Sequence, residues 1–252
     1  MELKEILAQK TLFAFNLDDF TIFKGIIRAL EEKKSPAIIQ LSAGEASFWG
    51  LENFIRLAKP LKDKKIFLNI DHGKNLELLK KAIDLGFDMV HFDGSALSWE
   101  ENINLTAKAS KLAHSQGVIA EGEPESQNTN PAKVAEFVRK TKVDLVAVFC
   151  GNKHGFNLQK PENLNFERLR EIKKAAKPAL LALHGGSGVP EDQIKKAIKE
   201  KLIAKININS VLRDAYFKTL KKQLSCYKGN KAYDLLGLVS QAVSEKANSL
   251  LA

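Results

Sequence analysis

Short apolar runs alternate with longer amphipathic stretches along the whole chain. Several of the apolar runs are almost uninterrupted, which is typical of parallel strands that are covered on both faces. The runs predict eight strands, at Thr11–Phe15, Pro36–Leu41, Lys65–Ile70, Asp88–Phe92, Val118–Glu123, Val143–Phe149, Ala179–Leu183 and Ala204–Ile206. The stretches between them predict helices, for example at Leu76–Leu85, Asn102–Gln116, Phe166–Ala176 and Glu191–Lys199.

The order of these elements indicates the fold. Gly86 and Gly117 stand where helices should stop, and Pro190 opens the helix that follows it. Strict strand–helix alternation without a linker or a shift in composition predicts a single domain over residues 1–252, a closed α/β barrel of the (β/α)8 (TIM) type. A doubly wound open sheet is the alternative. The last stretch, Tyr233–Leu251, predicts an extra C-terminal helix.

Composition narrows the class of protein. With 44% hydrophobic and 27% charged residues, the chain resembles an ordinary soluble enzyme. No apolar run reaches the roughly 18 residues that a membrane helix needs, and the start lacks a signal-peptide pattern, so we expect no membrane partner. Two distant cysteines, Cys150 and Cys226, argue against a disulfide framework and for the reducing cytoplasm.

The net charge of +9 raises the question of nucleic-acid binding. A nucleic-acid-binding protein would cluster its basic residues on one element, with aromatic residues between them. Here the lysines are spread over the predicted helices, as at Lys195, Lys196 and Lys199. Solvated helix faces explain this spread better, and we expect no nucleic-acid partner. The excess charge can still attract an anionic metabolite.

Three of the five histidines follow predicted strands, where barrel enzymes carry their working residues. His72, His154 and His184 come after the third, sixth and seventh strands, whereas we interpret His91 and His114 as structural. Each histidine alone is more simply a satisfied polar group, but three on one rim indicate a metal site. Imidazole is the usual nitrogen ligand of Zn²⁺, and Co²⁺ or Fe²⁺ also suit it.

Glycine-rich segments after the last two strands indicate an anion site. Barrels often bind phosphate with the loops after strands seven and eight and a helix N-terminus. The segment His184–Gly188 follows the seventh strand, and Asn207–Ser210 follows the eighth and opens a helix. Asn209 or Ser210 can also cap that helix, and a cap is compatible with a phosphate ligand because both use the same exposed N–H groups.

Several of these motifs together resemble the class II (metal-dependent) fructose-bisphosphate aldolases and their tagatose-bisphosphate relatives. The resemblance runs nearly end to end and is carried by Ala14-Phe15-Asn16, Gln40 through Gly44, Asp71-His72-Gly73, Asp93-Gly94-Ser95, His154-Gly155, Leu183 through Gly188 and Lys205 through Asn209. It implies a lyase that reversibly cleaves a ketose (bis)phosphate, such as fructose 1,6-bisphosphate, into dihydroxyacetone phosphate and an aldehyde. It also implies a homodimer or a larger homo-oligomer.

The resemblance implies a role for individual residues. His72, His154 and His184 would bind zinc, Asp71 would be the acid/base at the substrate's C4 hydroxyl, and Asn207 would lie near the reacting carbons. Asn16 and Ser42 would contact the substrate, Ser42 on its second carbonyl half. The phosphate of the dihydroxyacetone phosphate half would be bound by Gly155, Gly185, Ser187, Asn209 and Ser210. The metal would act as a Lewis acid on the ketone and stabilise the enediolate.

The chain departs from the family pattern after the fifth strand and near the C-terminus. The mobile loop that carries the family's basic glutamate is much shorter here, so that Glu123, or Glu125, must supply the base. Lys231 aligns with an arginine that reaches the partner subunit's second phosphate, and lysine lacks the bidentate fork. Val211 stands where the family often has an acid.

These departures leave two readings besides an active class II aldolase. One is a divergent aldolase-like protein that acts on another phosphorylated sugar or has little activity of its own. The other is a different barrel with a metal or phosphate site, including a binding protein without enzymatic activity. An acid close to the substrate carbons after the fifth strand would favour the active enzyme.

Overall fold

Eight parallel strands close into a barrel in chain order, with the first strand paired to the eighth. The structure is a computed structural model that describes residues 2–152 and 162–251. Its strands are β1 (Leu12–Asn16), β2 (Ala37–Ser42), β3 (Ile66–Gly73), β4 (Met89–Phe92), β5 (Ile119–Gly122), β6 (Leu145–Val148), β7 (Leu180–Leu183) and β8 (Lys205–Ile208). The sequence-based prediction of a closed (β/α)8 barrel is confirmed, and the open-sheet alternative is wrong.

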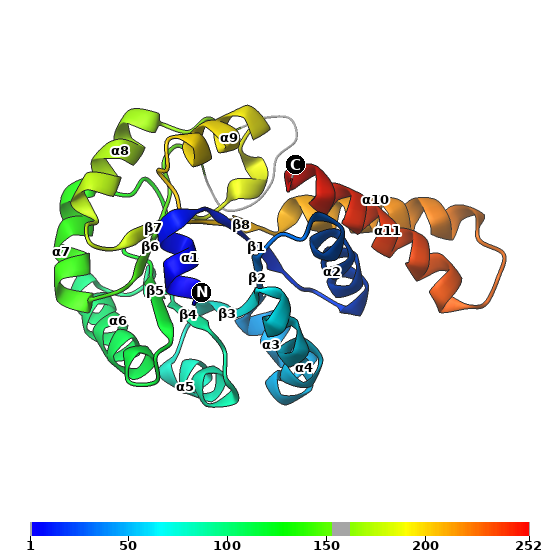
Figure 1. The fold of residues 1–252 in the computed structure, drawn as a ribbon, viewed down its shortest axis with the longest axis horizontal. Helices are drawn as coiled ribbons and strands as arrows, with labels where there is room; N and C mark the ends of the chain where they lie inside the picture. Colours follow the sequence, from blue (N-terminus) through cyan, green and yellow to red (C-terminus); the bar gives the residue numbers. More distant parts are fainter. Residues whose placement is uncertain (1, 153–161, 252) are drawn as a thin grey trace.

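Helices follow the strands and surround the barrel (Figure 1). Local sequence determines where they begin and end: Ser42 and Ser98 form capping boxes, and Gly86 ends a helix with a φ of 92°. The surrounding helices are α2 (Phe20–Lys33), α3 (Ala43–Trp49), α4 (Leu51–Ala58), α5 (Leu76–Leu85), α6 (Trp99–His114), α7 (Pro131–Thr141), α8 (Phe166–Ala175) and α9 (Glu191–Lys199), with 3₁₀ turns η1 (Lys59–Lys64) and η2 (Gly186–Gly188).

A short N-terminal helix, α1 (Leu3–Gln9), closes the N-terminal end of the barrel and was not predicted from the sequence. Its Leu3, Ile6 and Leu7 are buried against side chains from the lower ends of the strands, such as Ile38 and Met89. Seven residues are too few to show a clear helical period. The hydrophobic core therefore extends below the strands as well as between the strands and the surrounding helices.

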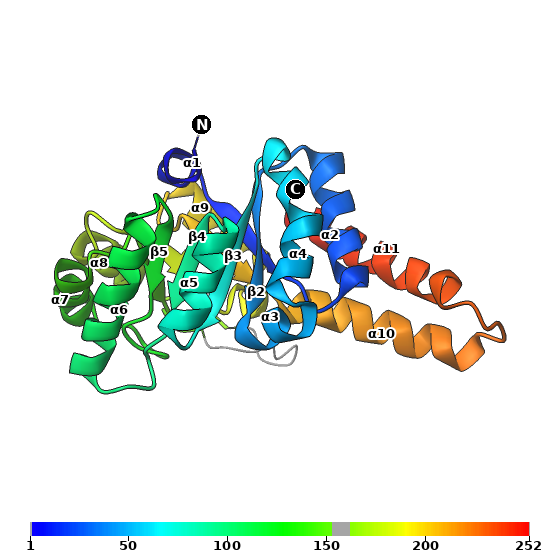
Figure 2. The same ribbon diagram turned by 90° about the horizontal axis from the view of Figure 1, so that it is seen from below.

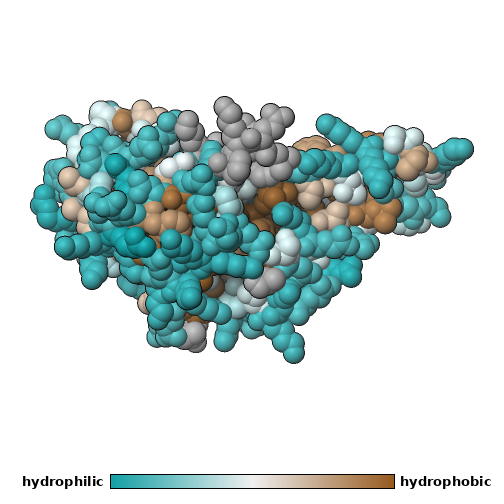
Figure 3. All heavy atoms as spheres, turned by 90° about the horizontal axis from the view of Figure 1, so that it is seen from above, coloured by the Kyte–Doolittle hydropathy of each residue, from teal (hydrophilic) through white to brown (hydrophobic). Residues whose placement is uncertain are grey.

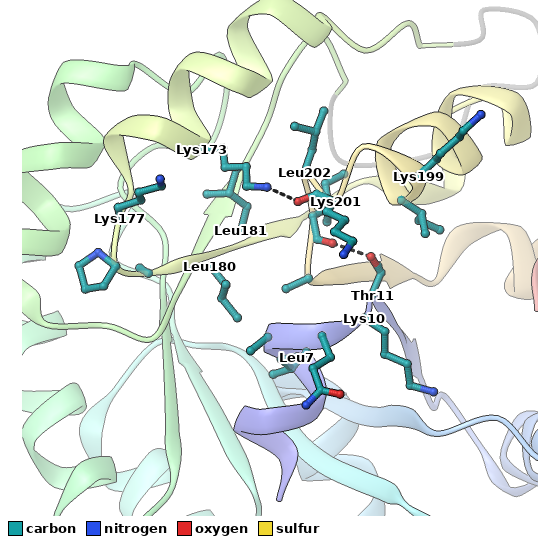
Figure 4. A pocket seen from close by; sticks show the side chains of 17 residues that line it. Leu7, Lys10, Thr11, Lys173, Lys177, Leu180, Leu181, Lys199, Lys201 and Leu202 are labelled. Atoms are coloured by element: carbon teal, nitrogen blue, oxygen red, sulfur yellow. Dashed lines mark hydrogen bonds between the residues drawn. The ribbon is translucent and has the colours of Figure 1, made fainter. Parts of the chain in front are cut away.

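A cavity of about 890 Å³ lies beside α1 at this end of the barrel (Figure 4). Its floor is apolar and includes Leu7 and Leu181, and lysines such as Lys173 and Lys199 stand around its rim. These two lysines lie in the last turns of α8 and α9, where positive side chains stabilise the negative helix ends. Stabilisation of the two helix ends therefore explains why Lys173 and Lys199 stand at this rim.

The two C-terminal helices, α10 (Ser210–Cys226) and α11 (Ala232–Leu250), form an antiparallel pair, called here the arm, that projects from the barrel (Figures 1 and 2). α11 returns to pack on α2. The contact is close because Gly25 has no side chain: a Cβ there would lie 2.6 Å from the carbonyl oxygen of Ser240. The predicted extra C-terminal helix is confirmed as α11. Within the described residues, no helix is long and apolar enough to span a membrane.

Candidate metal and substrate site

Two histidines from different strands bring their ring nitrogens together at the C-terminal end of the barrel. His72 lies near the end of β3, and His184 directly follows β7. Nδ1 of His184 lies 3.2 Å from Nε2 of His72. Two nitrogens that each bind a tetrahedral Zn²⁺ at about 2.0–2.1 Å stand roughly this far apart. The pair therefore has the spacing of two ligands of one metal ion.

A carboxylate lies behind each of these imidazoles. Nδ1 of His72 lies 2.8 Å from Oδ2 of Asp93, and Nε2 of His184 lies 2.6 Å from Oε1 of Glu121. A carboxylate on the far nitrogen holds a proton there and leaves the near nitrogen free as a ligand. Glu121 is itself fully buried and accepts a hydrogen bond from Nζ of buried Lys205 at 2.8 Å. Both rings are thus fixed in the orientation that a cation requires.

Burial shifts the protonation of the two rings in opposite directions. Burial lowers the pKa of His184 to about 3, against the opposing effect of Glu121, so that its imidazole is neutral. Burial also works against protonation of His72, but the charges of Asp71 and Glu123 and the hydrogen bond to Asp93 raise its pKa to about 9. His72 would therefore have to lose a proton in order to bind a cation.

Asp71 is held on both carboxylate oxygens by asparagines from β1 and β8. Nδ2 of Asn16 donates to its Oδ2 at 3.2 Å, and Nδ2 of Asn207 donates to its Oδ1 at 3.0 Å. Burial opposes ionisation of Asp71, but the charges of His72 and Lys205 keep its pKa well below the ordinary value. Asp71 is therefore an ionised, fixed proton acceptor beside the two histidines.

A chain of buried amides positions Asn16 in turn. Oδ1 of Asn16 accepts from Nε2 of Gln40 at 2.8 Å, and Oε1 of Gln40 accepts from Nδ2 of Asn69 at 2.9 Å. These three side chains come from β1, β2 and β3 and are almost completely buried. The polar interior of the barrel thus supports the site from below.

Glu123, just after β5, is a buried acid that faces the imidazoles. Its Oε2 lies 3.5 Å from Nδ1 of His72 and 3.8 Å from Nδ1 of His184. Burial raises the pKa of Glu123 to about 7. Glu125, the other candidate from the sequence, instead accepts from the backbone N–H of Asn130 and pairs with Lys133 at the start of α7. Of the two acids, Glu123 is the one that the structure places among the histidines.

His91 also belongs to this cluster, so its interpretation as a merely structural residue was incomplete. Its ring centroid lies 4.8 Å from that of His72 and 5.0 Å from that of His184. The sequence held a signal, because side chains alternate along a strand and His91 stands two residues before Asp93 at the end of β4. His114 lies apart from the cluster, with Nε2 2.7 Å from Asp144.

The loops after β7 and β8 meet, as the expected phosphate site requires. Gly185 has a φ of 66°, and Oγ of Ser187 accepts a hydrogen bond from the backbone N–H of Asn209 at 3.1 Å. Asn209 is the N-cap of α10 but makes no side-chain capping bond, and Ser210 is the first residue of that helix. The N-terminus of a long helix thus lies beside the glycine-rich segment that follows His184.

The remaining site residues from the sequence lie in three different settings. Ser42 is the N-cap of α3, where its Oγ accepts from the N–H of Glu45 at 3.3 Å. Lys231 lies in the connection between α10 and α11, at the far end of the arm (Figures 1 and 2). His154 and Gly155, the expected third metal ligand and a phosphate ligand, lie outside the described residues.

Comparison with known proteins identifies the family. A family profile described as "Fructose-bisphosphate aldolase class-II" matches residues 8–251. The chain is 36% identical over 229 residues to the sulfofructosephosphate aldolase of Alkalicoccus urumqiensis, covering 84% of this chain and 79% of that protein. It is 32% identical over 253 residues to the probable fructose-bisphosphate aldolase of Bacillus subtilis (strain 168), covering 92% and 87%.

A solved structure agrees with this assignment. The crystal structure of the YdjI aldolase from Escherichia coli K12 matches with a TM-score of 0.86 and 32% identity, covering 98% of this chain and 92% of that one. Sequence and fold therefore match over almost the same span of the chain. The chain belongs to the class II fructose-bisphosphate aldolase family, a family of lyases that act on phosphorylated sugars.

Proposed function

We propose that this protein is a metal-dependent aldolase that reversibly cleaves a ketose (bis)phosphate, such as fructose 1,6-bisphosphate, into dihydroxyacetone phosphate and an aldehyde. The observation that carries the proposal is the 3.2 Å separation of the His72 and His184 nitrogens. A carboxylate lies behind each ring, and the ionised Asp71 lies beside the pair.

The metal in this proposal is Zn²⁺, with Co²⁺ or Fe²⁺ as substitutes, bound by His72, His184 and His154. The donor set fits because neutral imidazoles backed by carboxylates are typical of zinc sites. The buried Oδ1 of Asn207 and both oxygens of Glu123 also make no hydrogen bond within the described residues. When bound, such an ion acts as a Lewis acid on the ketone and stabilises the charge that develops as the C3–C4 bond breaks.

The protein's own acids handle the protons of the reaction. Asp71 takes the proton of the C4 hydroxyl during cleavage and returns it during condensation, and Asn16 and Asn207 keep its carboxylate oriented. Asn207 lies between Asp71 and His184, and this position supports a role for it beside the reacting carbons. Glu123 is the base for the dihydroxyacetone phosphate half, since its raised pKa lets it exchange a proton near neutral pH.

Substrate binding involves the loops after β7 and β8. Gly185, Ser187, Asn209 and Ser210, together with Gly155, bind the phosphate of the dihydroxyacetone phosphate half. The N-terminus of α10 supplies N–H donors and the positive end of a helix dipole. Asn16 and Ser42 contact the rest of the substrate.

We further propose a homodimer or larger homo-oligomer formed through the arm. The arm exposes several large apolar side chains: Phe217 is 51% exposed, Leu224 61%, Tyr233 68% and Leu238 46%. Figure 3 shows apolar side chains gathered along the arm and where it meets the barrel. Lys231, at the end of the arm, would then reach the second phosphate in the partner's site. A cytoplasmic location and a role in glycolysis complete the proposal.

A second candidate keeps the chemistry and changes the substrate or the activity. The 36% identity to a sulfofructosephosphate aldolase favours a ketose phosphate with a different anionic group at its other end. A lysine rather than an arginine at position 231 also fits a changed group there. The shorter loop after β5 would in that case mark a divergent enzyme, with little activity on fructose 1,6-bisphosphate.

The deciding experiment measures cleavage of fructose 1,6-bisphosphate by the purified protein with and without Zn²⁺ or Co²⁺, with His184→Ala as the control. Metal-dependent turnover that disappears in His184→Ala supports the first candidate. Stoichiometric metal binding without turnover directs the same assay to sulfofructose phosphate and supports the second. A protein that binds no metal and cleaves neither compound contradicts both.

A further inference from the structure

Besides a longer approach of its Nδ1 to Oδ1 of Asp71, at 3.6 Å, His91 makes two contacts with the site that distinguish it from an ordinary core residue. It is fully buried, and its Nδ1 accepts a hydrogen bond from the backbone N–H of His72 at 3.0 Å. Its Nε2 lies 3.7 Å from Oε2 of Glu123. His91 thus contacts a residue proposed as a metal ligand on one side and the residue proposed as the base on the other.

The contact with His72 determines which nitrogen of His91 carries hydrogen. A backbone N–H can only donate, so Nδ1 of His91 must accept and is unprotonated. The neutral ring therefore carries its hydrogen on Nε2, which faces Glu123. In this tautomer Nδ1 is occupied and Nε2 is protonated, so His91 itself is no metal ligand even though it lies among groups that could hold an ion.

The backbone that His91 holds is an unusual one. His72 has a φ of 51°, in the left-handed region that residues with a side chain seldom adopt. The register between β3 and β4 also shifts between Ile70 and Gly73. This local turn directs the N–H of His72 towards His91 and its ring towards His184. A ligand that sits on strained backbone needs a partner to keep it there.

The contact with Glu123 joins two buried polar groups, a ring nitrogen of His91 and a carboxylate that also lies 3.5 Å from Nδ1 of His72. Within the described residues, Nε2 of His91 and both carboxylate oxygens of Glu123 make no hydrogen bond. A buried donor and a buried acceptor left apart are both destabilised. Because Nε2 and Oε2 lie 3.7 Å apart, a small movement of Glu123 towards His91 would form a bond from Nε2–H to the carboxylate and would fix the direction of the remaining oxygen.

We propose that His91 is a positioning residue with two separate effects: its Nδ1 holds His72 in the conformation that binds the metal, and its Nε2–H orients Glu123. This inference rests on the proposed function, because it assigns His91 to the same metal and the same base. It predicts that metal affinity and turnover depend on different nitrogens of a single ring.

Two amide side chains separate the two effects. In His91→Asn, the side-chain oxygen stands near the position of Nδ1 and can accept from His72, but nothing reaches Glu123. In His91→Gln, the amide nitrogen stands near the position of Nε2 and can donate to Glu123, but the acceptor for His72 is lost. His91→Met removes both contacts. His114→Gln is the matched control, because His114 is a histidine outside the site.

The readouts are Zn²⁺ affinity, by competition with a chromophoric chelator, the visible spectrum of the Co²⁺-loaded protein, and turnover at saturating metal. Loss of an outer partner of a ligand typically costs about 10–100-fold in metal affinity. We expect that loss and a changed Co²⁺ spectrum in His91→Met and His91→Gln, with His91→Asn close to wild type. At saturating metal we expect the turnover of His91→Asn to fall by tenfold or more, since an oriented base contributes about 10²–10⁴-fold, and His91→Gln to retain most of it.

Several outcomes would overturn the proposal. Wild-type metal affinity in His91→Gln means that His72 does not need the contact, and undiminished turnover in His91→Asn means that Glu123 does not. Equal losses in both variants, accompanied by lower thermal stability, indicate a packing role only. If His91→Met fails to fold, the comparison of His91→Asn with His91→Gln still tests both contacts. A wild-type protein that neither binds metal nor cleaves a ketose phosphate contradicts the proposed function instead.

Discussion

Nε2 of His72 and Nδ1 of His184 lie 3.2 Å apart although 112 positions separate the two residues in the chain. They meet because the C-terminal ends of β3 and β7 lie on the same rim of the barrel, so that side chains from remote strands converge there. Asp93 and Glu121, from the ends of β4 and β5, approach the same two rings from behind. Four different strands therefore determine the geometry of this pair of candidate metal ligands.

Metal binding should stabilise the folded protein. A ligand that binds only the native state at about 100 times its dissociation constant adds roughly 2.7 kcal/mol to the free energy of unfolding. Removing metal with a chelator should therefore lower the melting temperature, and Zn²⁺ should restore it. Differential scanning fluorimetry on wild type and His184→Ala checks this. A Zn²⁺-induced rise of the same size in His184→Ala would contradict the assignment of that ligand.

The stability of the fold should require that Lys205 and Glu121 are both present or both replaced. Both side chains are completely buried, so Lys205→Met leaves the Glu121 carboxylate without its cation. Loss of one partner of a buried ion pair costs about 3–5 kcal/mol. We expect that decrease in the free energy of unfolding of Lys205→Met, measured in urea. The double variant Lys205→Met/Glu121→Gln should recover part of it, and a double variant less stable than the single one would refute this explanation.

Asp71→Asn should abolish most of the activity without removing the metal. An amide cannot take the C4 hydroxyl proton, and such a proton transfer contributes about 10²–10⁴-fold to the rate. We expect kcat to fall within that range while Zn²⁺ content stays near that of wild type. Asp63→Asn, at an exposed position in η1, is the control. Retained kcat in Asp71→Asn would transfer the acid/base role to another residue.

Asp144 should make stability depend on acid pH. It accepts from Lys4 and His114 at 2.7 Å each and from the backbone N–H of Ala120 at 3.0 Å, and although burial opposes ionisation, these contacts lower its pKa. A lowered carboxyl pKa stabilises the folded state above the ordinary value of 3.8, and this stabilisation is lost as the pH falls below it.

Asp144→Asn should accordingly lower the free energy of unfolding by about 1–3 kcal/mol at pH 6.5. The difference from wild type should shrink as the pH falls below 3.8. Urea denaturation at a series of pH values measures both effects. Asp84→Asn, in an exposed pair with Lys80, should change stability by only about 0.3–0.5 kcal/mol. A difference for Asp144→Asn that does not vary with pH would contradict the ionic explanation.

The arm should be required for self-association. The double variant Phe217→Ser/Leu224→Ser removes two apolar side chains of α10 that are each at least half exposed. If these residues are buried in an interface, replacing them with serine removes contacts that exclude water from that interface. We expect sedimentation velocity to show a dimer or larger species for wild type and a monomer for the double variant. Leu97→Ser, at an exposed leucine after β4, should leave the assembly unchanged. A monomeric wild type would refute the proposed oligomer.

The sequence predicted the barrel well because the signal for it is repeated. Each buried strand is an apolar run next to an amphipathic helix, and the observed strands begin and end within a few residues of the predicted ones. α1 was missed because it is short and its burial depends on the strand ends that surround it. Periodicity along the chain cannot reveal a helix whose partners come from the whole ring of strands.

The sequence predicted most of the individual site residues but not which of them contact one another. Asp71, His72 and His184 stand in recognisable motifs, and the structure brings them together. Alternation along β4 put His91 on the same face as Asp93, but its approach to the same rings also depends on the register shift in β3 and on the left-handed backbone of His72. The sequence favoured Glu123 but kept Glu125 open as a substitute, and the contacts of Glu125 at the start of α7 separate the two.

The two asparagines that hold Asp71 come from the first and the last strand of the barrel, β1 and β8. The seam at which the ring closes therefore runs directly beside this carboxylate. In a nascent chain, Asp71 can therefore gain its contact with Asn207 only after β8 has been synthesised. A circular permutant cut between β4 and β5 would instead carry β8 and β1 as consecutive strands, with α10, α11 and α1 between them, and both asparagines would then precede Asp71 in the chain.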